Sequence, residues 1–153
     1  RRQNMPLFSK IPIDKQQVEK AIFQLEKQTS AELRVYVERK IPRKAQVNTG
    51  FERALQIFDE LGMQATEAHN GVLIYVAFRA HQCAIIGDQG IHQYVGDAFW
   101  QQQCDLMISH FRQNAYTQGI IVAIDNIAKE LANYFPIQPD DKNELDNEVI
   151  ING

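Results

Sequence analysis

The stretch over residues 70–91, NGVLIYVAFRAHQCAIIGDQGI, constrains the fold of this chain more than any other. Residues 71–78 contain no charged side chain, which is typical of a strand covered on both faces of a sheet. Residues 79–81 then predict a short turn, and residues 83–86 predict a second apolar strand. We expect these two strands to pair antiparallel at the centre of a mixed sheet.

The residues before this hairpin predict a helix and another strand. Apolar side chains recur at helical spacing from Val18 to Leu25, and Asp14 stands where an N-cap is expected, so we predict a helix over residues 15–28. Residues 31–38 alternate instead, with Leu33, Val35 and Val37 on one side and polar side chains on the other. That period of two predicts a strand.

Three further helical segments complete the expected fold. One apolar stripe precedes the hairpin, with Asn48 or Thr49 as its cap and Gly62 at its end. After the hairpin, Asp97 is expected to cap a helix, and a last helix stops before Pro136. The members of the three stripes are Phe51, Ala54, Leu55, Phe58 and Leu61; Trp100, Cys104, Met107, Ile108 and Phe111; and Ile120, Ile124, Ile127, Ala128 and Leu131.

This order of elements predicts the fold class. A strand–helix–strand unit implies a parallel crossover, and the hairpin that follows it makes the sheet mixed. Helices before and after the sheet have to cover both of its faces. We therefore expect an α/β protein, a three-layer α/β/α sandwich with a β-α-β crossover, a β-hairpin and C-terminal helices.

Length and composition exclude several classes of protein. A chain of 153 residues fits one domain with a real core. The longest apolar run, residues 72–78, is too short to span a bilayer, and no signal peptide is recognisable, so we expect a cytoplasmic protein without a membrane span. Because the sequence begins at Arg1 and not at a methionine, an exported or processed form is kept as the alternative expectation. Cys83 and Cys104 lie in apolar patterns and are expected to be buried thiols, with a disulfide as the alternative.

The charges are unevenly distributed. The net charge is −3, yet residues 1–44 are basic and the tail is acidic. A basic cluster follows the first strand and reads either as a solvated loop or as an anion-binding rim. The same choice applies to the rim where Glu38, Arg79 and His81 are expected to gather. No aromatic residues are interleaved with the basic ones, so we expect no nucleic-acid surface.

Strand pairing brings several polar residues to one rim of the expected sheet. In a hairpin that turns near Ala80, residues whose numbers sum to about 160 face each other, which brings Asn70 and Asp88 to the same end. The parallel first strand adds Glu32 there. We expect His69 beside them, and Asp97 to join from the next helix.

Carboxylate and amide oxygens are the ligands that Ca²⁺ or Mg²⁺ prefers. The sequence therefore predicts a divalent-cation site formed by Glu32, Asn70, Asp88 and Asp97. Each residue also has an ordinary structural interpretation. Asp88 can be an N-cap, Asn70 a turn residue, and Glu32 a solvated carboxylate or the partner of Arg34.

Several segments, taken in order, resemble the TPM domain family, also called TPM-phosphatase-like. They are TSAELRVYVE, LGMQAT, NGVLIYVA, AIIGDQGI, Phe99-Trp100 and residues 119–124, and NELDNEV resembles the tail of the short, soluble branch. The resemblance covers residues 14–136. It divides the chain into an N-terminal extension (1–13), a TPM-like α/β domain (14–136) and an acidic tail (137–153).

The resemblance implies an α/β/α sandwich. Some members of the family are associated with weak acid-phosphatase activity, divalent-metal binding or maintenance of membrane complexes such as photosystem II. Many longer members carry a signal peptide and a membrane anchor. Exported members commonly read Gly-Tyr-Gly after the third strand, where this chain has Gly87-Asp88-Gln89-Gly90, and often have an acid where it has His69.

Three functions follow, in this order. No cysteine-phosphatase loop is present, because Gln89 and His110 occupy the positions six residues after the two cysteines, and no GxSxG or phosphate-binding loop occurs. We therefore expect first a binding or accessory module with a protein partner that the sequence does not identify. The alternative is a weak metal-assisted acid phosphatase that hydrolyses phosphomonoesters. The third is an oligomerising domain whose tail adds an edge strand through residues 149–151.

Overall fold

The computed structural model describes residues 11–139 and 143–152. Each helix and strand expected between residues 15 and 132 is present, and its ends lie within about two residues of the predicted ones, an ordinary difference in assignment. In chain order the elements are α1 (Lys15–Glu26), β1 (Glu32–Glu38), the short 3-10 helix η2 (Arg43–Ala45), α2 (Gly50–Glu60), β2 (Gly71–Ala77), β3 (Gln82–Gly87), α3 (Gln89–His92), α4 (Asp97–Phe111), α5 (Tyr116–Ala132) and β4 (Ile150–Asn152).

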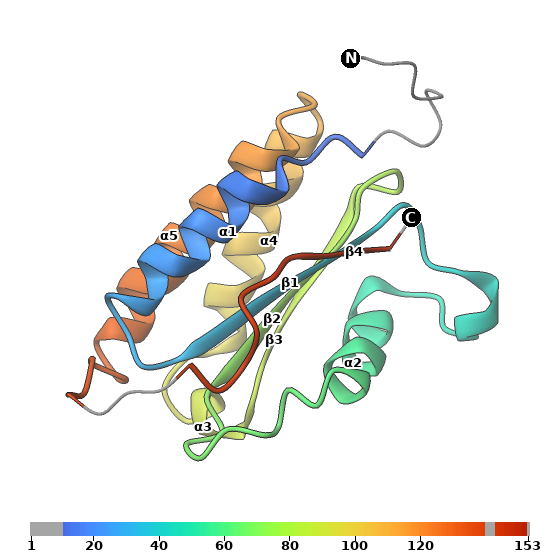
Figure 1. Cartoon of the computed structure of the whole chain (residues 1–153). Helices are drawn as coiled ribbons and strands as arrows, with labels where there is room; N and C mark the ends of the chain where they lie inside the picture. The colour runs from blue at the N-terminus through green and yellow to red at the C-terminus, as the bar shows by residue number, and fades with distance from the viewer. Residues whose placement is uncertain (1–10, 140–142, 153) are drawn as a thin grey trace.

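The four strands form one mixed sheet in the order β3-β2-β1-β4. Strand β1 runs parallel to β2 and β4, whereas β2 and β3 form the antiparallel hairpin. Helices α1, α4 and α5 lie on one face of the sheet and α2 lies on the other (Figure 1). The predicted three-layer α/β/α sandwich is therefore confirmed.

The strand registers place the ends of the sheet. Glu32 lies opposite Gly71 at the start of the parallel pair, and Val72 lies opposite Gly87 in the hairpin. Paired residue numbers in the hairpin thus sum to 159, one less than expected. His81, with φ of 50°, supplies the left-handed residue of the turn.

Two apolar clusters pack on the two faces of the sheet. Leu33, Val35 and Val37 belong to the larger cluster, which includes the apolar residues of α1, α4 and α5. Leu73 and Tyr75 belong to the smaller cluster beneath α2. Every residue of β2 is buried, as a strand covered on both faces must be.

Helix α2 is rotated relative to the predicted stripe. Phe51 and Leu55 were expected to face the core, but their side chains are 58% and 44% exposed. The buried side of the helix instead includes Arg53, together with Ala54 and Ile57. The prediction was wrong at these two positions because Arg53 has to face inward to reach a buried partner.

That partner is Glu38, at the end of β1. Arg53 donates from Nε to Glu38 Oε2 at 2.8 Å and from Nη2 to Oε1 at 3.1 Å, and the Tyr75 hydroxyl donates to Oε2 at 2.5 Å. Burial, followed by the bond to Glu38, raises the pKa of Tyr75. Glu38 was expected at a solvated rim or a docking surface for an anion, and the structure corrects this, because its carboxylate is enclosed and paired.

The acidic tail folds back along the open edge of β1. Residues Ile150–Asn152 pair in parallel with Tyr36, Val37 and Glu38 of the same chain. The sequence singled out residues 149–151 of the tail, and Leu145 is buried as well and joins the cluster beneath α2. The predicted edge strand is thus present, and its partner is this chain's own β1. Residues 1–10, most of the predicted N-terminal extension, lie outside the described residues.

Two smaller expectations concern membranes and cysteines. None of the helices in the described ranges has the length and apolar character needed to cross a bilayer. Cys83 and Cys104 are free thiols, the first half-buried and the second buried. The hydrogen bond with Cys104, followed by burial, raises the pKa of the Cys83 thiol, which keeps it protonated.

Candidate metal centre

Three of the predicted site residues lie side by side at one rim of the sheet. Glu32 pairs with Gly71 across the parallel strands, and the amide of Asp88 donates to the carbonyl of Gly71 at 2.9 Å. Asn70 directly precedes Gly71, and its carbonyl accepts from the Glu32 amide at 3.2 Å. Gly71, which has no side chain, thus lies between two carboxyl-bearing residues. A Cβ there would lie 2.8 Å from the Met63 carbonyl oxygen, which covers this position.

Glu32 is the most perturbed carboxyl at this rim. Its Oε1 accepts a hydrogen bond from the amide of Leu145 at 3.0 Å, which brings the tail over the rim. Burial is the main cause that raises the pKa of Glu32 to about 7; the nearby carboxylates of Glu26 and Glu144 act in the same direction, and the hydrogen bond from Leu145 acts against them. The side chain therefore exchanges a proton close to neutral pH.

Asn70 is held by its backbone and by one side of its amide. Its main-chain N–H donates to Thr66 Oγ1 at 3.1 Å, and its Nδ2 donates to the Ser30 carbonyl at 3.4 Å. The other side of the amide, Oδ1, is buried and makes no hydrogen bond with any described residue. The Oδ1 atom of Asn70 is thus an acceptor without a hydrogen bond from the described residues, and a role as a turn residue alone does not account for it.

Asp88 is the N-cap of α3 and keeps one oxygen free of hydrogen bonds. Oδ1 accepts from the Gln89 amide at 2.7 Å, which confirms the capping interpretation. Oδ2 is buried and makes no hydrogen bond with the described residues, although His69 Nδ1 lies 3.5 Å away, close enough for an ion pair when the imidazole is protonated.

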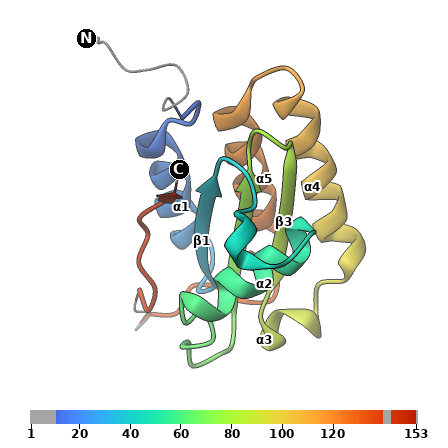
Figure 2. The same ribbon diagram turned by 90° about the vertical axis from the view of Figure 1, so that its right-hand side faces the viewer.

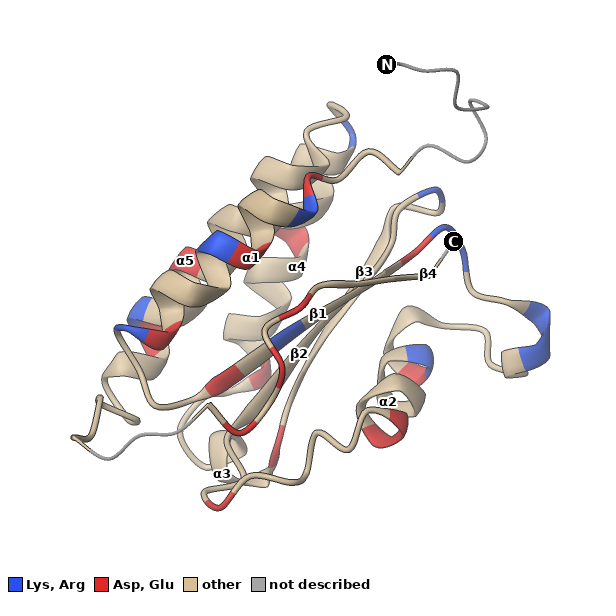
Figure 3. Ribbon diagram, in the orientation of Figure 1, with Lys and Arg blue, Asp and Glu red and all other residues tan. Residues whose placement is uncertain are grey.

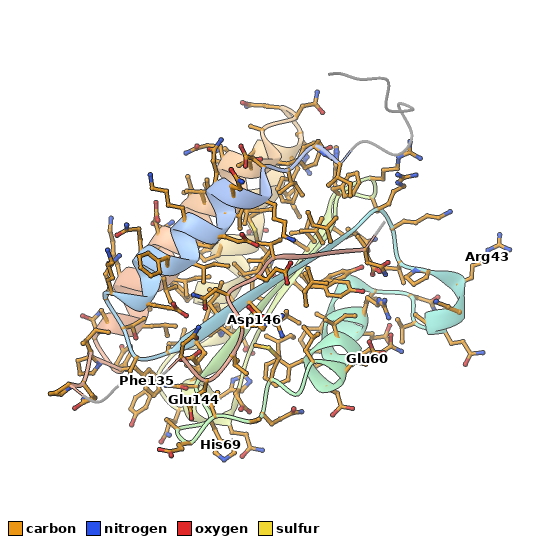
Figure 4. The ribbon with its side chains drawn as sticks, in the orientation of Figure 1. Arg43, Glu60, His69, Phe135, Glu144 and Asp146 are labelled. Atoms are coloured by element: carbon orange, nitrogen blue, oxygen red, sulfur yellow. The ribbon has the colours of Figure 1, made fainter. Side chains whose placement is uncertain are left out.

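His69 is set in place by its backbone. It adopts a left-handed φ of 49°, and its carbonyl accepts from the Gly90 amide at 2.8 Å. Its side chain is about half exposed. Figure 4 shows His69 at the same end of the molecule as Glu144, the tail residue whose carboxylate accepts from the Glu67 amide.

Among the described residues, no hydrogen bond or ion pair joins Asp97 to Glu32, Asn70 or Asp88, although Asp97 and Gly87, the residue before Asp88, line the same groove. Asp97 is the first residue of α4 rather than its N-cap, which is Gly96, so the predicted cap was wrong by one residue. Glycine and aspartate both occur often at the N-cap, so the sequence does not distinguish Gly96 from Asp97 there. The exposed carboxylate of Asp97 lies in the first turn of α4 instead, where it interacts favourably with the helix dipole. Its side chain lines that groove together with Phe51 and Gln101.

The rim therefore offers two carboxyl groups and an amide oxygen from three neighbouring segments. Within residues 11–139 and 143–152, no group of three or more His, Cys, Asp or Glu side chains is placed to hold a metal ion. A cation at the rim would depend on Glu32, Asp88, the Asn70 amide oxygen and water. The two buried oxygens without hydrogen bonds, Asn70 Oδ1 and Asp88 Oδ2, have the chemistry that such an ion needs.

One feature of the surface was missed by sequence reasoning. A groove of about 470 Å³ runs along β3, between α2 and α4. Phe51 and Leu55 form part of its lining, and the sequence had assigned both to the core. The signal in the sequence was Arg53, the one basic residue of α2, which is two positions from each of them. Residues two apart lie on roughly opposite sides of a helix, so an inward Arg53 turns Phe51 and Leu55 outward.

A family model described as the TPM domain matches residues 8–130. The chain belongs to the TPM domain family. No curated protein matches it.

Solved structures agree with this membership. The NMR structure of BA42 protein from the psychrophilic bacterium Bizionia argentinensis is 34% identical, covers 97% of this chain and 100% of its own, and has a TM-score of 0.83. The N-terminal domain of a P. gingivalis protein is 18% identical, with a TM-score of 0.61, covering 76% of this chain and 72% of that one. A Corynebacterium glutamicum N-terminal domain is 12% identical, with a TM-score of 0.53, covering 88% and 76%. The last two show the fold alone. The match to BA42 extends over nearly all of the TPM domain and its tail.

Proposed function

We propose that this TPM domain is a binding or accessory module that takes Ca²⁺ or Mg²⁺ at the rim of Glu32, Asn70 and Asp88 and acts on a protein partner. The observation that carries the proposal is the pair of buried oxygens, Asn70 Oδ1 and Asp88 Oδ2, that make no hydrogen bond with the described residues. A buried acceptor without a partner costs about 1–3 kcal/mol. A hard cation would recover that cost, because oxygen ligands are the ones it prefers.

The small number of protein ligands limits the affinity. Calcium takes six to eight oxygen ligands in most protein sites, and sites with few charged ligands bind it at about 10⁻⁴–10⁻³ M. Two carboxyl groups and one amide oxygen leave several positions for water, or for a carboxylate of a partner. A cation at this rim therefore suits a docking role, in which it joins two surfaces.

A proton competes with the cation at Glu32. Burial holds the pKa of this carboxyl at about 7, so a fraction of the side chain is neutral at physiological pH. A bound cation stabilises the ionised form and lowers that pKa. Affinity for Ca²⁺ should therefore rise between pH 6 and pH 8.

The test is a titration of the full chain with CaCl₂, and separately with MgCl₂, followed by backbone amide shifts. We expect saturable shifts at Glu32, Asn70 and Asp88 with a Kd of about 0.1–1 mM. Asp88→Asn and Glu32→Gln should each weaken binding about tenfold. Asp97→Asn tests whether the fourth predicted ligand takes part, and Asp59→Asn, on the exposed surface of α2, is the matched control. Unchanged amide signals at the rim, with both metals, contradict the proposal.

A second candidate is weak metal-assisted hydrolysis of phosphomonoesters. What favours it is the presence, on either side of Gly71, of Glu32, a carboxyl with a pKa of about 7, and of Asp88, whose Oδ2 has no hydrogen bond with the described residues. Groups with perturbed pKa values are common at acid–base sites. When bound, a cation would polarise the phosphate group. Hydrolysis of p-nitrophenyl phosphate should then be lost in Asp88→Asn while the fold is kept. Equal activity in that variant contradicts this candidate.

A further inference from the structure

The outer edge of β3 has no strand partner among the described residues, although Cys104 of α4 lies against part of it. Strand β3 ends the sheet, and β2 is its one strand partner among the described residues. Because the Asp88 amide donates to Gly71, the alternation of an antiparallel pair directs the main-chain groups of Cys83, Ile85 and Gly87 away from β2. The Ile85 amide reaches the Cys104 sulfur, a weak acceptor. The carbonyls of Cys83, Ile85 and Gly87 accept no hydrogen bond from another described residue. This edge can therefore pair with an added strand.

The edge forms the floor of the groove of about 470 Å³. Figure 2 shows β3 at the side of the sheet away from the tail, with α2 in front of it and α4 beside it. One wall is Phe51 and Leu55 of α2, and the other includes Asp97, Gln101 and Ile108 of α4. An extended chain on this floor would direct alternate side chains toward the two walls.

The two walls differ in chemistry. Phe51 and Leu55 are among the most exposed large apolar side chains of the described residues, so the first wall is apolar. On the second wall, Asp97 lines the groove, and Gln101 donates to the carboxylate of Asp105 at 2.9 Å. This wall is mixed, because Trp100, Cys104 and Ile108 also line it, and Asp97 is its one acidic lining residue among those the structure describes, with Asp105 next to it through Gln101.

Among the described residues that line the groove, none is a lysine or arginine, and His92 is the one histidine. Helix α4 carries Asp97 and Asp105 but no lysine or arginine, and its ribbon shows acidic segments only (Figure 3). The basic residue of α2 is Arg53, which is buried and committed to Glu38. Strand β3 itself carries no charge. A complementary ligand is therefore basic on the side that faces α4.

We propose that the outer edge of β3 receives an extended segment of a partner protein as an additional strand. Its alternate apolar side chains pack on Phe51 and Leu55, and its intervening lysine or arginine side chains face Asp97 and Asp105. Main-chain hydrogen bonds to β3 supply the affinity, and the alternating pattern supplies the specificity, as in other cases of strand addition. A second copy of this chain is a poor occupant, because pairing two β3 edges would bring the acidic α4 helices of both copies together.

The probe is a capped peptide of about eight residues that alternates valine and lysine, added to the full chain in a buffer that contains EDTA. Trp100, the one tryptophan of the sequence, lines the groove and reports binding by its fluorescence. We expect saturable binding with a Kd of about 10–500 µM, within the range of weak peptide contacts. Amide shifts should map to β3, and exchange of the Gly87 amide with solvent should slow about tenfold.

Two altered peptides test the mechanism. Methylation of the peptide nitrogens that face β3 removes the donors to its carbonyls and should weaken binding at least about tenfold. A peptide that alternates valine and glutamate should bind at least about tenfold more weakly, because it meets acidic groups on α4. Equal binding of either altered peptide overturns the proposal.

A matched pair of variants tests whether the peptide binds in the groove along β3. Leu55→Lys puts a charge into the apolar wall at an exposed position and should weaken binding of the valine–lysine peptide about tenfold. Phe23→Lys changes a similarly exposed residue of α1 on the other face of the sheet and should bind as the parent does. Circular dichroism checks the fold of both. Absence of saturable binding, or amide shifts outside β3, α2 and α4, overturns the proposal. So does a dimer of the full chain that Leu55→Lys dissociates, because the occupant is then a second copy.

Discussion

Arg53 and Glu38 meet in a two-point ion pair that fastens α2 to the end of β1, with N···O distances of 2.8 and 3.1 Å. Both side chains are almost fully buried. The pair holds α2 in the rotation that leaves Phe51 and Leu55 facing the groove. Because both charges are buried, the pair also affects the stability of the fold.

Removing the guanidinium should unfold the protein more easily. Arg53→Met leaves the Glu38 carboxylate buried without its cation, and loss of one partner of a buried pair costs about 3–5 kcal/mol. We expect this drop in the free energy of unfolding by urea denaturation, and partial recovery in the double variant with Glu38→Gln. Arg43→Met, at an exposed position, should change it by less than about 0.5 kcal/mol. A drop for Arg53→Met no larger than that of the control would contradict the account.

The pH dependence of stability should carry the signature of Glu32. The carboxyl has a pKa of about 7 in the folded state and 4.5 as its ordinary value, so between these values the folded state binds more protons than the unfolded state. The free energy of unfolding therefore falls as the pH rises from about 4.5 to about 7, and then levels off. The accumulated loss is about 1–3 kcal/mol.

Glu32→Gln separates this effect from others. The glutamine oxygen can still accept from the Leu145 amide but has no charge to bury, so the fall in stability between pH 5 and pH 8 should disappear. Glu52→Gln is the control. Hydrogen bonds from Thr49 and from the backbone of Asn48 lower the pKa of Glu52. Its contribution to stability is therefore present at pH values above its ordinary pKa and is lost as the pH falls, the opposite direction to Glu32. A Glu32→Gln protein that keeps the parent slope would show that another group is responsible.

Gly90 should tolerate no side chain. A Cβ at this position would lie 2.2 Å from the Ala68 carbonyl oxygen and 2.6 Å from that of His69, both main-chain atoms that cannot turn aside. We expect Gly90→Ala to cost about 2–3 kcal/mol, at the upper end of overpacking effects, and to disturb the amide signals of Asp88. Gly96→Ala, where no atom lies within 4 Å of the new Cβ, should cost less than about 1 kcal/mol. Similar costs for the two variants would contradict this reading of the rim.

The tail should be part of the cooperative unit. Val149 packs into the cluster beneath α1, and Leu145 packs into the cluster beneath α2, so the tail contributes to both sides of the sheet. Leu145→Ala should lower the free energy of unfolding by about 2–4 kcal/mol, and Val149→Ala by about 1–3 kcal/mol. Ile137→Ala, at a half-exposed position, is the control and should cost less than about 1 kcal/mol. Single unfolding transitions are expected for all three, and a separate early transition for the tail would count against its integration.

The sheet could be predicted because its signals are local. The turn at residues 79–81 determines which residues of the hairpin face each other, and the parallel crossover then brings Glu32 to the end where Asn70 and Asp88 lie. These relations need no knowledge of side-chain packing. The membership of the family was likewise evident from short segments of the chain.

The rest depended on contacts between distant residues. Phe51 and Leu55 belong to a regular apolar stripe, which predicts that they face the core. They face outward because Arg53 on the other side of the helix binds the buried Glu38, fifteen positions earlier in the chain. The cover over Glu32 comes from Leu145, 113 residues away. Periodicity within a helix or strand carries no information about such partners, so neither the groove nor the burial of the rim could be read from it.

The parallel pairing of β1 with β4 has a consequence for the order of events during biosynthesis. Asn152 and Glu38, whose side chains meet at the end of this pairing, are 114 residues apart in the chain. Contacts of such separation are the slowest to form, because they close the longest loop. A nascent chain on the ribosome therefore holds β1 with one unprotected side until residue 152 has emerged, and the tail can close that side from then on.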